Sequence, residues 1–195
     1  MSMVLRPQIQ TENVSMLTLV AALATARALE HKGVYEKQMP CIKWPNDLVL
    51  HKKKICGILT ELVLEGTNID YVIIGIGINV SNQVFPEEIK ETASSILLET
   101  GKNMDRESII AEVWKCFEKD YERFLQNQDL SLLKEEYETY LVNKHQKVNV
   151  LDPAGNYEGT AIGITNKGEL IVDTGKETRF VSSGEVSVRG IYGYV

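Results

Sequence analysis

The sequence predicts an α+β fold followed by a small β-barrel, because helical and strand-like patterns occur in separate runs. Up to about residue 143, helices with apolar residues at 3.6-residue spacing stand beside short apolar strands. From Lys147 onward the helical spacing ends, and short strand-like runs follow one another between Gly, Pro, Asn and Asp residues, which is typical of a small barrel. We therefore expect two domains, residues 1–143 and 146–195.

The first part is expected to begin with a strand and a long helix. Met1–Pro7 has the pattern of the second half of a strand, and because strands rarely begin at a translation start, we expect a segment upstream to be missing. Apolar residues from about Glu12 to His31 recur at helical spacing, and Gly33 suits the position just past the helix end. Further strands are expected at Ile42–Trp44, Asp47–His51, Ile55–Glu65 and Tyr71–Val80, with His51–Lys54 as a hairpin tip.

Helices are expected to dominate the next sixty residues or so. Phe85–Glu88 suits a short helix start, with proline at the first position and acids behind it, and Ala93–Thr100 suits another short helix. Asp105 is expected to cap a long helix that runs to about residue 126, and Ser131 to cap a last helix through Leu141. Barrel strands are then expected at Lys147–Leu151, Tyr157–Thr165, Glu169–Val172, Thr178–Val181 and Val186–Arg189.

The composition narrows the class of protein. The chain of 195 residues is 44% hydrophobic and 25% charged, which is ordinary for a soluble globular protein. Its net charge of −6 offers no broad basic surface for nucleic acid. Three cysteines without a CxxC pair favour a reducing compartment over a disulfide framework. No apolar run is long enough for a membrane span and no signal-peptide pattern occurs, so a cytoplasmic location is expected.

Three polar blocks at the ends of short apolar runs are the candidates for chemistry. They are KWPNDL at residues 43–48, KICGIL at 54–59 and GIGINV at 75–80. A sheet presents fixed polar groups to a small ligand in this way. Lys54 can direct a positive charge at a phosphate or a carboxylate, and Gly57 would let a ligand lie against the backbone. The amide of Asn79 has donors and an acceptor in one plane, which matches the edge of an adenine.

Each block alone also has a plainer interpretation. GIGINV lacks the third glycine and the following helix of a dinucleotide-binding fingerprint, and can be a strand whose glycines allow close packing. Lys52–Lys54 can be a solvated basic turn. The KWPND segment can be a bulge that buries the indole of Trp44. In the functional interpretation, Asn46 and Asp47 orient Lys54 or a metal-bound nucleotide.

The histidines and cysteines do not predict a metal site. His31, His51 and His145 show no HxxxH spacing and no cysteine partners at zinc-ligand spacing. Cys116 falls within the long predicted helix and is expected to be a packing residue. GxSxG, Walker A and kinase signatures do not occur.

Taken together, the order and spacing of the three blocks resemble those of the biotin–protein ligase (holocarboxylase synthetase) family. The segment Ser183–Arg189 is similar to the end of that family's C-terminal barrel. The resemblance implies a mixed β-sheet flanked by helices, related to class II aminoacyl-tRNA synthetases, and then an SH3-like barrel. It also implies ATP-dependent formation of biotinyl-5′-AMP, assisted by Mg²⁺, and transfer of biotin to a lysine of a biotin carboxyl carrier protein.

The resemblance also assigns roles to residues. Lys54 matches the lysine that holds the biotin carboxylate and the adenylate phosphate, and Asp47 stands beside it as the second catalytic residue. Asn79 matches the asparagine that reads adenine. The remaining binding positions that it implies are Lys43, Asn46, Gly57, Ile58, Gly75 and Gly77. It implies no protein-held metal site.

The family pattern is not complete in these 195 residues. A Gly/Arg-rich loop of the form GRGRxGR, an earlier Ser-Thr-Asn segment and the DNA-binding helix-turn-helix of some members do not occur. Two other hypotheses therefore stay open: an inactive fragment that keeps the adenine side of the pocket and a dimer contact, and a lipoate-type acyl ligase. The KWPND block and the barrel favour biotin over lipoate. Neither a nucleic acid nor a membrane is expected as a partner, and a homodimer is an expectation of the resemblance.

Overall fold

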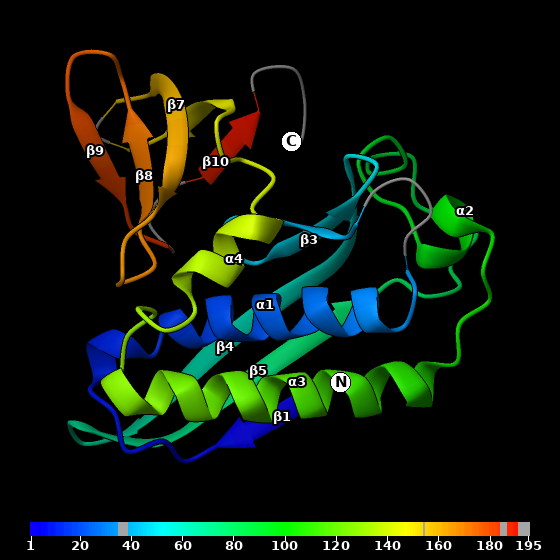
Figure 1. The fold of residues 1–195 in the computed structure, drawn as a ribbon, viewed down its shortest axis with the longest axis horizontal. Helices are drawn as coiled ribbons and strands as arrows, with labels where there is room; N and C mark the ends of the chain where they lie inside the picture. Colours follow the sequence, from blue (N-terminus) through cyan, green and yellow to red (C-terminus); the bar gives the residue numbers. More distant parts are fainter. Residues whose placement is uncertain (35–38, 154, 184–186, 191–195) are drawn as a thin grey trace.

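Two five-stranded sheets and a stack of helices make up the part of the chain that the computed structural model describes, residues 1–34, 39–153, 155–183 and 187–190 (Figure 1). The first sheet has the strand order β1-β5-β4-β3-β2, and the second has β10-β6-β7-β8-β9. Their strand pairs are all antiparallel. The parallel pairings among the described residues are two isolated bridges, Ile42 with Leu141 and Lys54 with Ala93. The predicted α+β fold class is confirmed.

The strands of the first sheet agree with the prediction except at the hairpin before Lys53 and at the last strand, which runs from Asn68 to Ile78 rather than from Tyr71 to Val80. They are β1 (Ser2–Leu5), β2 (Cys41–Lys43), β3 (Asp47–Leu50), β4 (Lys53–Glu65) and β5 (Asn68–Ile78). The turn between β3 and β4 is formed by His51 and Lys52, whose φ angles are 47° and 68°. Lys53 and Lys54 therefore lie in a strand rather than at the predicted hairpin tip, and the ladder fixes where the Lys54 side chain starts.

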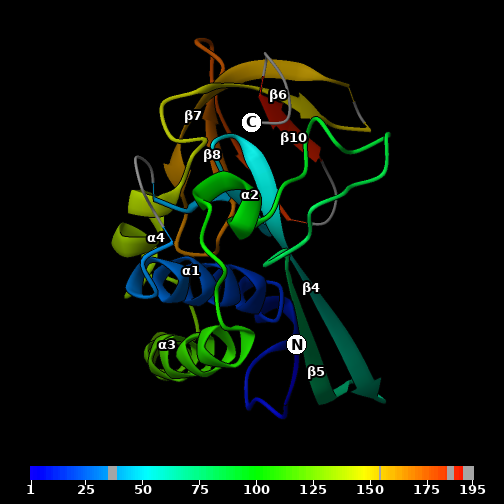
Figure 2. The ribbon, with the colours of Figure 1, turned by 90° about the vertical axis from the view of Figure 1, so that its right-hand side faces the viewer.

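Helix α1 lies at the centre of the first domain. The helices are α1 (Met16–His31), α2 (Ile96–Thr100), α3 (Arg106–Asn127) and α4 (Lys134–Tyr140), with a 3-10 turn at Thr11–Asn13. Twelve of the 16 residues of α1 are buried, because the first sheet covers one side of this helix and α3 covers another (Figure 2). Its alanine-rich middle lets both neighbours approach closely. The helix ends as predicted, with Gly33 at φ 72°.

Three helix starts were predicted wrongly, and one correctly. Phe85–Glu88 begins no helix; residues 87–92 form turns in which Ile89 N and Lys90 N donate to Pro86 O. Ala93 pairs with β4, so α2 starts only at Ile96, where Ser95 accepts from Leu98 N at 3.2 Å. Ser131 is not a cap, since α4 begins at Lys134 after Leu133. Asp105 does cap α3, accepting from Ser108 N at 2.8 Å.

The second sheet follows the predicted strands closely. It consists of β6 (Lys147–Leu151), β7 (Tyr157–Ile164), β8 (Leu170–Asp173), β9 (Thr178–Val181) and β10 (Ser187–Gly190). Because β10 returns to pair with β6, the last described strand lies beside the first of this sheet, as expected for a small SH3-like unit. Val186, the predicted first residue of the last strand, lies outside the described residues, as do Gly184 and Glu185.

The indole of Trp44 joins the two sheets. Trp44 is 2% exposed, and its Nε1 donates to Gly168 O in the turn before β8 at 2.9 Å. Its backbone N donates to Asn143 Oδ1 at 3.1 Å. The expected packing role of this residue agrees with its burial. The peptide that follows it, Pro45-Asn46-Asp47, is therefore held from the side of the second sheet as well as from the first.

The carboxylate of Glu138 links helix α4 to the second sheet. Glu138 lies on α4 with a side chain that is 14% exposed. Its Oε1 accepts from Ile164 N at 3.0 Å, and its Oε2 pairs with Lys144 Nζ at 2.7 Å. Burial acts to raise the pKa of this carboxyl, but the hydrogen bonds from Lys144 and Ile164 outweigh burial and hold the pKa below its ordinary value of 4.5.

We expect Glu138→Ala to lower the free energy of unfolding by about 2 kcal/mol at pH 7. A carboxyl whose pKa is depressed in the folded state stabilises the protein above its unfolded pKa and loses that contribution as the pH falls through the folded value. The difference between variant and parent should therefore shrink in denaturant melts below about pH 4.5. Glu135→Ala, an exposed change on the same helix, is the control, and a pH-independent deficit in Glu138→Ala would contradict this account.

Candidate active site

Three glycines form the floor of a cavity on the first sheet. Gly57 of β4 lies opposite Gly77 of β5 in the ladder, and Gly75 lies opposite Leu59. The residues that alternate with them, such as Ile58 and Ile76, are buried in the core. Because neighbouring residues in a strand face opposite sides, the glycines face away from α1. Without side chains they leave a hollow of about 490 Å³ that is bounded by backbone.

Lys54 and Asp47 form an ion pair at the edge of this floor. Their Nζ and Oδ1 atoms are 2.6 Å apart, and the side chains are 39% and 12% exposed. The register between β3 and β4 shifts where Val49 pairs with Lys54 and Leu48 with Cys56. Such a bulge redirects a side chain. A Cβ placed on Gly57 would lie 3.1 Å from Lys54 Cε, so the ammonium group lies directly over the glycine. The three lysines of the KKK run are therefore not equivalent.

Asn46 is fixed to β4 rather than to Lys54. Its Nδ2 donates to Ile58 O at 2.9 Å, and its backbone O accepts from Ile58 N at 2.9 Å. This double contact extends the β3–β4 pairing by one residue and aligns the KWPND segment with the glycine floor. Of the two residues predicted to orient Lys54, Asp47 is the one that contacts it.

Asn79 and Lys43 lie beside the cavity rather than among its lining residues. Asn79 Nδ2 donates to Ser94 O at 3.1 Å, and Ser94 N donates to Lys54 O at 2.9 Å. Lys54 N in turn donates to Thr92 O at 2.7 Å. The backbone of the segment Thr92–Ser94 thus connects Asn79 to Lys54 through hydrogen bonds. Lys43, opposite Asp47 in the β2–β3 ladder, is 7% exposed.

The cavity gathers seven of the nine predicted site residues. They are Asn46, Asp47, Lys54, Gly57, Ile58, Gly75 and Gly77. It also contains Met1, Leu59 and Ile76, which sequence reasoning missed. Leu59 and Ile76 fall within the second and third blocks, so they would have been found if every residue of each block had been predicted to line the site. No sequence signal pointed to Met1.

A second hollow lies beside the first, toward the N-terminal part of α1. It has a volume of about 370 Å³ and shares Asn46, Ile58 and Leu59 with the first hollow. Thr18 and Thr60, whose hydroxyls are 2.8 Å apart, line it as well. Because the glycines of the first hollow face away from α1, the second is a separate hollow that shares only part of its lining with the first.

Thiol chemistry is not available at the glycine floor. Cys56 precedes Gly57 and is buried on the core side of β4. Burial, together with the charge of Asp47, raises the pKa of Cys56 to about 12. This thiol therefore stays protonated at neutral pH and is not a nucleophile. The chemistry that the cavity can support is electrostatic: a fixed ammonium group, its carboxylate partner and exposed backbone.

Comparison with known proteins gives two family matches. Residues 1–79 match the Biotin/lipoate A/B protein ligase family, and residues 146–189 match the Biotin protein ligase C terminal domain. Among the described residues, no helix has both the length and the apolar character that crossing a bilayer requires.

Several relatives are similar over most of the chain. The "Bifunctional ligase/repressor BirA" of Bacillus subtilis is 34% identical over 190 residues, which cover 96% of this chain and 57% of the relative. The "Biotin--[acetyl-CoA-carboxylase] ligase" of Mycobacterium tuberculosis is 29% identical over 172 residues, or 87% of this chain and 61% of the relative. The chain thus spans somewhat more than half the length of these two curated relatives.

A solved structure is similar in fold as well as in sequence. The structure titled "Biotin protein ligase from Aquifex aeolicus in complex with biotin and ATP" superimposes with a TM-score of 0.83 at 32% identity, covering 97% of this chain and 77% of that one. The similarity in fold therefore extends over nearly the whole chain, both sheets included.

Proposed function

The chain belongs to the Biotin/lipoate A/B protein ligase family, and on this premise we propose that it acts as a biotin–protein ligase. In the first step the carboxylate of biotin attacks the α-phosphate of ATP, so that pyrophosphate leaves and biotinyl-5′-AMP forms. In the second step the ε-amine of a lysine on a biotin carboxyl carrier protein attacks the acyl carbon of this mixed anhydride, and AMP leaves. The observation that carries the proposal is the Lys54 ammonium fixed over a floor of glycines.

Lys54 is suited to both anionic partners of the first step. A lysine ammonium has three N–H donors, and the contact with Asp47 at 2.6 Å leaves others to face the cavity. There they can hold the biotin carboxylate and the α-phosphate close together, which removes their mutual repulsion. As negative charge develops on the phosphate oxygens, a cation already in position stabilises the transition state without reorganising. Asp47 keeps the flexible lysine side chain in that position.

Backbone exposure at Gly57, Gly75 and Gly77 supports close approach of the adenylate. All three glycines line the hollow, and Gly57 pairs directly with Gly77 in the ladder, so a side chain at any of these positions would project into the hollow. Asn79 is our candidate for reading adenine. The hydrogen bond that its amide makes to Ser94 O holds its plane, and this orientation is the requirement for edge recognition. Lys43 and Asn46 are proposed to lie on the phosphate side of the site, and Ile58 to hold Asn46 there through its backbone.

The residues present fit a magnesium ion that accompanies ATP. Mg²⁺ is usually held by one or two carboxylates together with substrate phosphates, and Asp47 offers a carboxylate on the cavity wall. Asp47 is therefore the residue that would hold the ion. When bound, Mg²⁺ would supply further neutralisation of phosphate charge.

We extend the proposal to organisation and partners. Residues 1–143 would be the catalytic domain and residues 146–195 the C-terminal domain, in a cytoplasmic protein.

The carrier domain must reach the cavity from the face of the first sheet that α1 does not cover. Val4 and Leu59 are 63% and 61% exposed, and such apolar residues support docking of a protein there, either the carrier or a second copy in a homodimer.

The decisive experiment is a two-part ligation assay. The chain, and the longest product of its gene, are incubated with ATP and labelled biotin, first alone and then with a biotin carboxyl carrier domain. We expect biotin-dependent exchange of pyrophosphate into ATP in the first part and a labelled carrier in the second. Exchange that lipoate supports and biotin does not would identify a lipoate-type ligase. Failure of both acids with every product would overturn the proposal in favour of an inactive remnant.

Gly57→Ala is expected to slow biotin-dependent pyrophosphate exchange by about tenfold or more. The added Cβ would lie 3.1 Å from Lys54 Cε and 3.2 Å from Nζ, so the ammonium group must move. Gly75→Ala is the matched control, because it adds the same methyl group to the same floor with only Leu59 O nearby at 3.8 Å. Equal losses in the two variants would mean that the methyl group crowds the ligand and that Lys54 is not the cause.

A further inference from the structure

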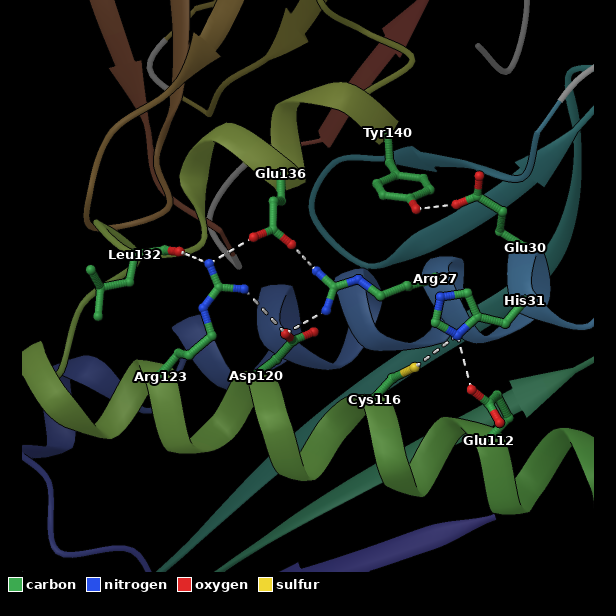
Figure 3. Close-up of polar contacts among 10 residues, drawn as sticks. All are labelled: Arg27, Glu30, His31, Glu112, Cys116, Asp120, Arg123, Leu132, Glu136 and Tyr140. Carbon is green, nitrogen blue, oxygen red and sulfur yellow. Dashed lines mark hydrogen bonds and ion pairs between the residues drawn. The ribbon is translucent and has the colours of Figure 1, made fainter.

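Three side chains with metal-binding atoms converge where the end of α1 meets α3. His31 comes from the last turn of α1, and Glu112 and Cys116 come from successive turns of α3 (Figure 3). His31 Nδ1 lies 2.9 Å from Glu112 Oε1 and 3.9 Å from Cys116 Sγ. One ligand atom from each of the three residues lies within 4.8 Å of the other two. Among the described residues, this is the one such group of three or more.

These separations are close to those within a tetrahedral zinc site. With metal bonds of about 2.0 Å to nitrogen and oxygen and about 2.3 Å to sulfur, tetrahedral ligands stand roughly 3.3 to 3.6 Å apart. The observed 2.9 Å and 3.9 Å lie on either side of that interval. The third pair, Glu112 and Cys116, lies within 4.8 Å, so side-chain rotations need to shorten that separation by no more than about 1.3 Å to admit an ion.

We propose that His31, Glu112 and Cys116 form a binding site for Zn²⁺ or a similar transition-metal ion. One imidazole, one carboxylate and one thiolate suit Zn²⁺, whereas Mg²⁺ and Ca²⁺ prefer oxygen ligands alone. Three protein ligands leave a fourth position for water. The site is open to that water and to the entering ion, since the His31 side chain is 51% exposed. The proposal does not depend on the ligase activity.

The protonation states of the three residues determine which protons must move when the ion binds. Burial, followed by the charge of Glu112, raises the pKa of the Cys116 thiol, so this residue is a thiol before the ion arrives. The hydrogen bond to His31 holds the pKa of Glu112 below its ordinary value, so this residue is already a carboxylate. The hydrogen bond to Glu112 places a proton on His31 Nδ1, so binding through this atom also requires the imidazole to change to the tautomer with its proton on Nε2. Binding therefore breaks the S–H bond of Cys116, forms a metal–sulfur bond and releases the thiol proton to solvent, while the imidazole proton moves from Nδ1 to Nε2.

An ion pair close to the three ligands holds α1 against α3. Asp120, one turn beyond Cys116 on α3, pairs with Arg27 of α1 at 2.8 Å, and Figure 3 shows this pair beside the cluster. Lys115 approaches Glu112 at 4.0 Å. The α1–α3 packing is thus set independently of any ion. A bound ion would add a covalent cross-link at the open end of this packing, where His31 is exposed.

The test uses the untagged chain after treatment with a chelator, titrated with ZnCl₂ alone by calorimetry and with CoCl₂ by absorption. We expect one ion per chain, a thiolate-to-cobalt charge-transfer band in the near ultraviolet, and a rise in melting temperature with ZnCl₂. Cys116→Ser should abolish the cobalt band. His31→Asn and Glu112→Gln should each weaken Zn²⁺ binding by roughly tenfold or more, since even outer partners of a metal site have effects of that size.

Two controls within the chain separate this site from adventitious binding. His51 Nδ1 and Glu99 Oε2 are also 2.9 Å apart, so His51→Asn removes a similar pair from another part of the fold. Cys41→Ser removes a different thiol. Both should leave the titration unchanged, and excess MgCl₂ should not displace the ion. The proposal is overturned if Cys116→Ser and His31→Asn, shown to be folded by circular dichroism, bind Zn²⁺ as the parent does, or if Cys41→Ser removes the cobalt band.

Discussion

Lys54→Ala is expected to slow biotin-dependent pyrophosphate exchange by a factor of roughly 10² to 10³, which corresponds to about 3 to 4 kcal/mol of transition-state stabilisation. The ammonium group is held 2.6 Å from Asp47 and over the glycine floor, where the transferring phosphate would lie. An alanine leaves the charge of that phosphate without its fixed counterion. The loss should appear in kcat as well as in kcat/KM, because the contact strengthens as charge develops. The measurement is exchange kinetics with the longest product of the gene.

Lys53→Ala provides the matched control for this prediction. Lys53 precedes Lys54 in β4 and pairs with Leu50 across the hairpin, so its side chain starts from the opposite face of the strand. We expect its replacement to change the exchange rate less than threefold. A larger loss in Lys53→Ala than in Lys54→Ala would show that the wrong lysine has been assigned to the phosphate. Asp47→Asn should give an intermediate loss, since it loosens Lys54 without removing it.

Arg27→Met is expected to lower the free energy of unfolding by about 3 to 5 kcal/mol at pH 7. Arg27 pairs with Asp120 at 2.8 Å between α1 and α3, where the two side chains are 12% and 0% exposed (Figure 3). It also contacts Glu136 of α4. Removing the guanidinium leaves the Asp120 carboxylate buried with only the more distant Arg123, at 3.7 Å. Chemical denaturation of the parent and the variant measures the difference.

The pH dependence and a double variant test the cause of that loss. Burial raises the pKa of Asp120 even with Arg27 present, so without Arg27 the carboxyl takes up a proton more readily. The deficit of Arg27→Met should therefore shrink as the pH is lowered from 7 toward 5. Adding Asp120→Leu should recover most of the stability, because apolar residues can replace a buried ion pair. No recovery would mean that packing of the arginine stem, rather than the buried charge, explains the loss.

An exposed pair of the same chemistry gives the comparison. Arg6 and Asp70 are 2.6 Å apart, but their side chains are 69% and 33% exposed. We expect Arg6→Met to lower the free energy of unfolding by no more than about 1 kcal/mol. Equal losses in Arg6→Met and Arg27→Met would refute the view that burial, rather than distance, determines the effect of these ion pairs.

Local signals predicted the elements that they control directly. The apolar spacing of α1 and Gly33 at its end, the Asp105 cap, and the turns between the short strands of the second sheet all depend on neighbouring residues in the sequence. Phe85–Glu88 has the signals of a helix start but no apolar repeat behind it, so no packed face holds a helix there. The segment Thr92–Ser94 is bound by backbone hydrogen bonds to Lys54. Such contacts cannot be predicted from the pattern of side chains in the sequence.

The candidate site was predictable in part for a similar reason. The three blocks lie on adjacent strands, so their glycines and Lys54 meet in one cavity, although their roles stay predictions. The contact between Lys54 and Asp47 depends on a register shift that the sequence does not specify. His31 and Cys116 are 85 residues apart and meet only through the packing of two helices. No spacing rule for metal ligands could have found them.

The hydrogen bond from the Trp44 indole to Gly168 O has a consequence for how the protein can be divided. The tryptophan immediately precedes the peptide that borders the glycine floor, and its ring is shielded from water by a loop of the second sheet. A polypeptide cut before residue 146 would expose that ring to water and replace its hydrogen bond to Gly168 O by one to solvent, at a cost of roughly 1 kcal/mol for the hydrogen bond alone. The carboxy-terminal module is thus a structural support for the first domain, and excising it would disturb the segment that we propose to face the triphosphate.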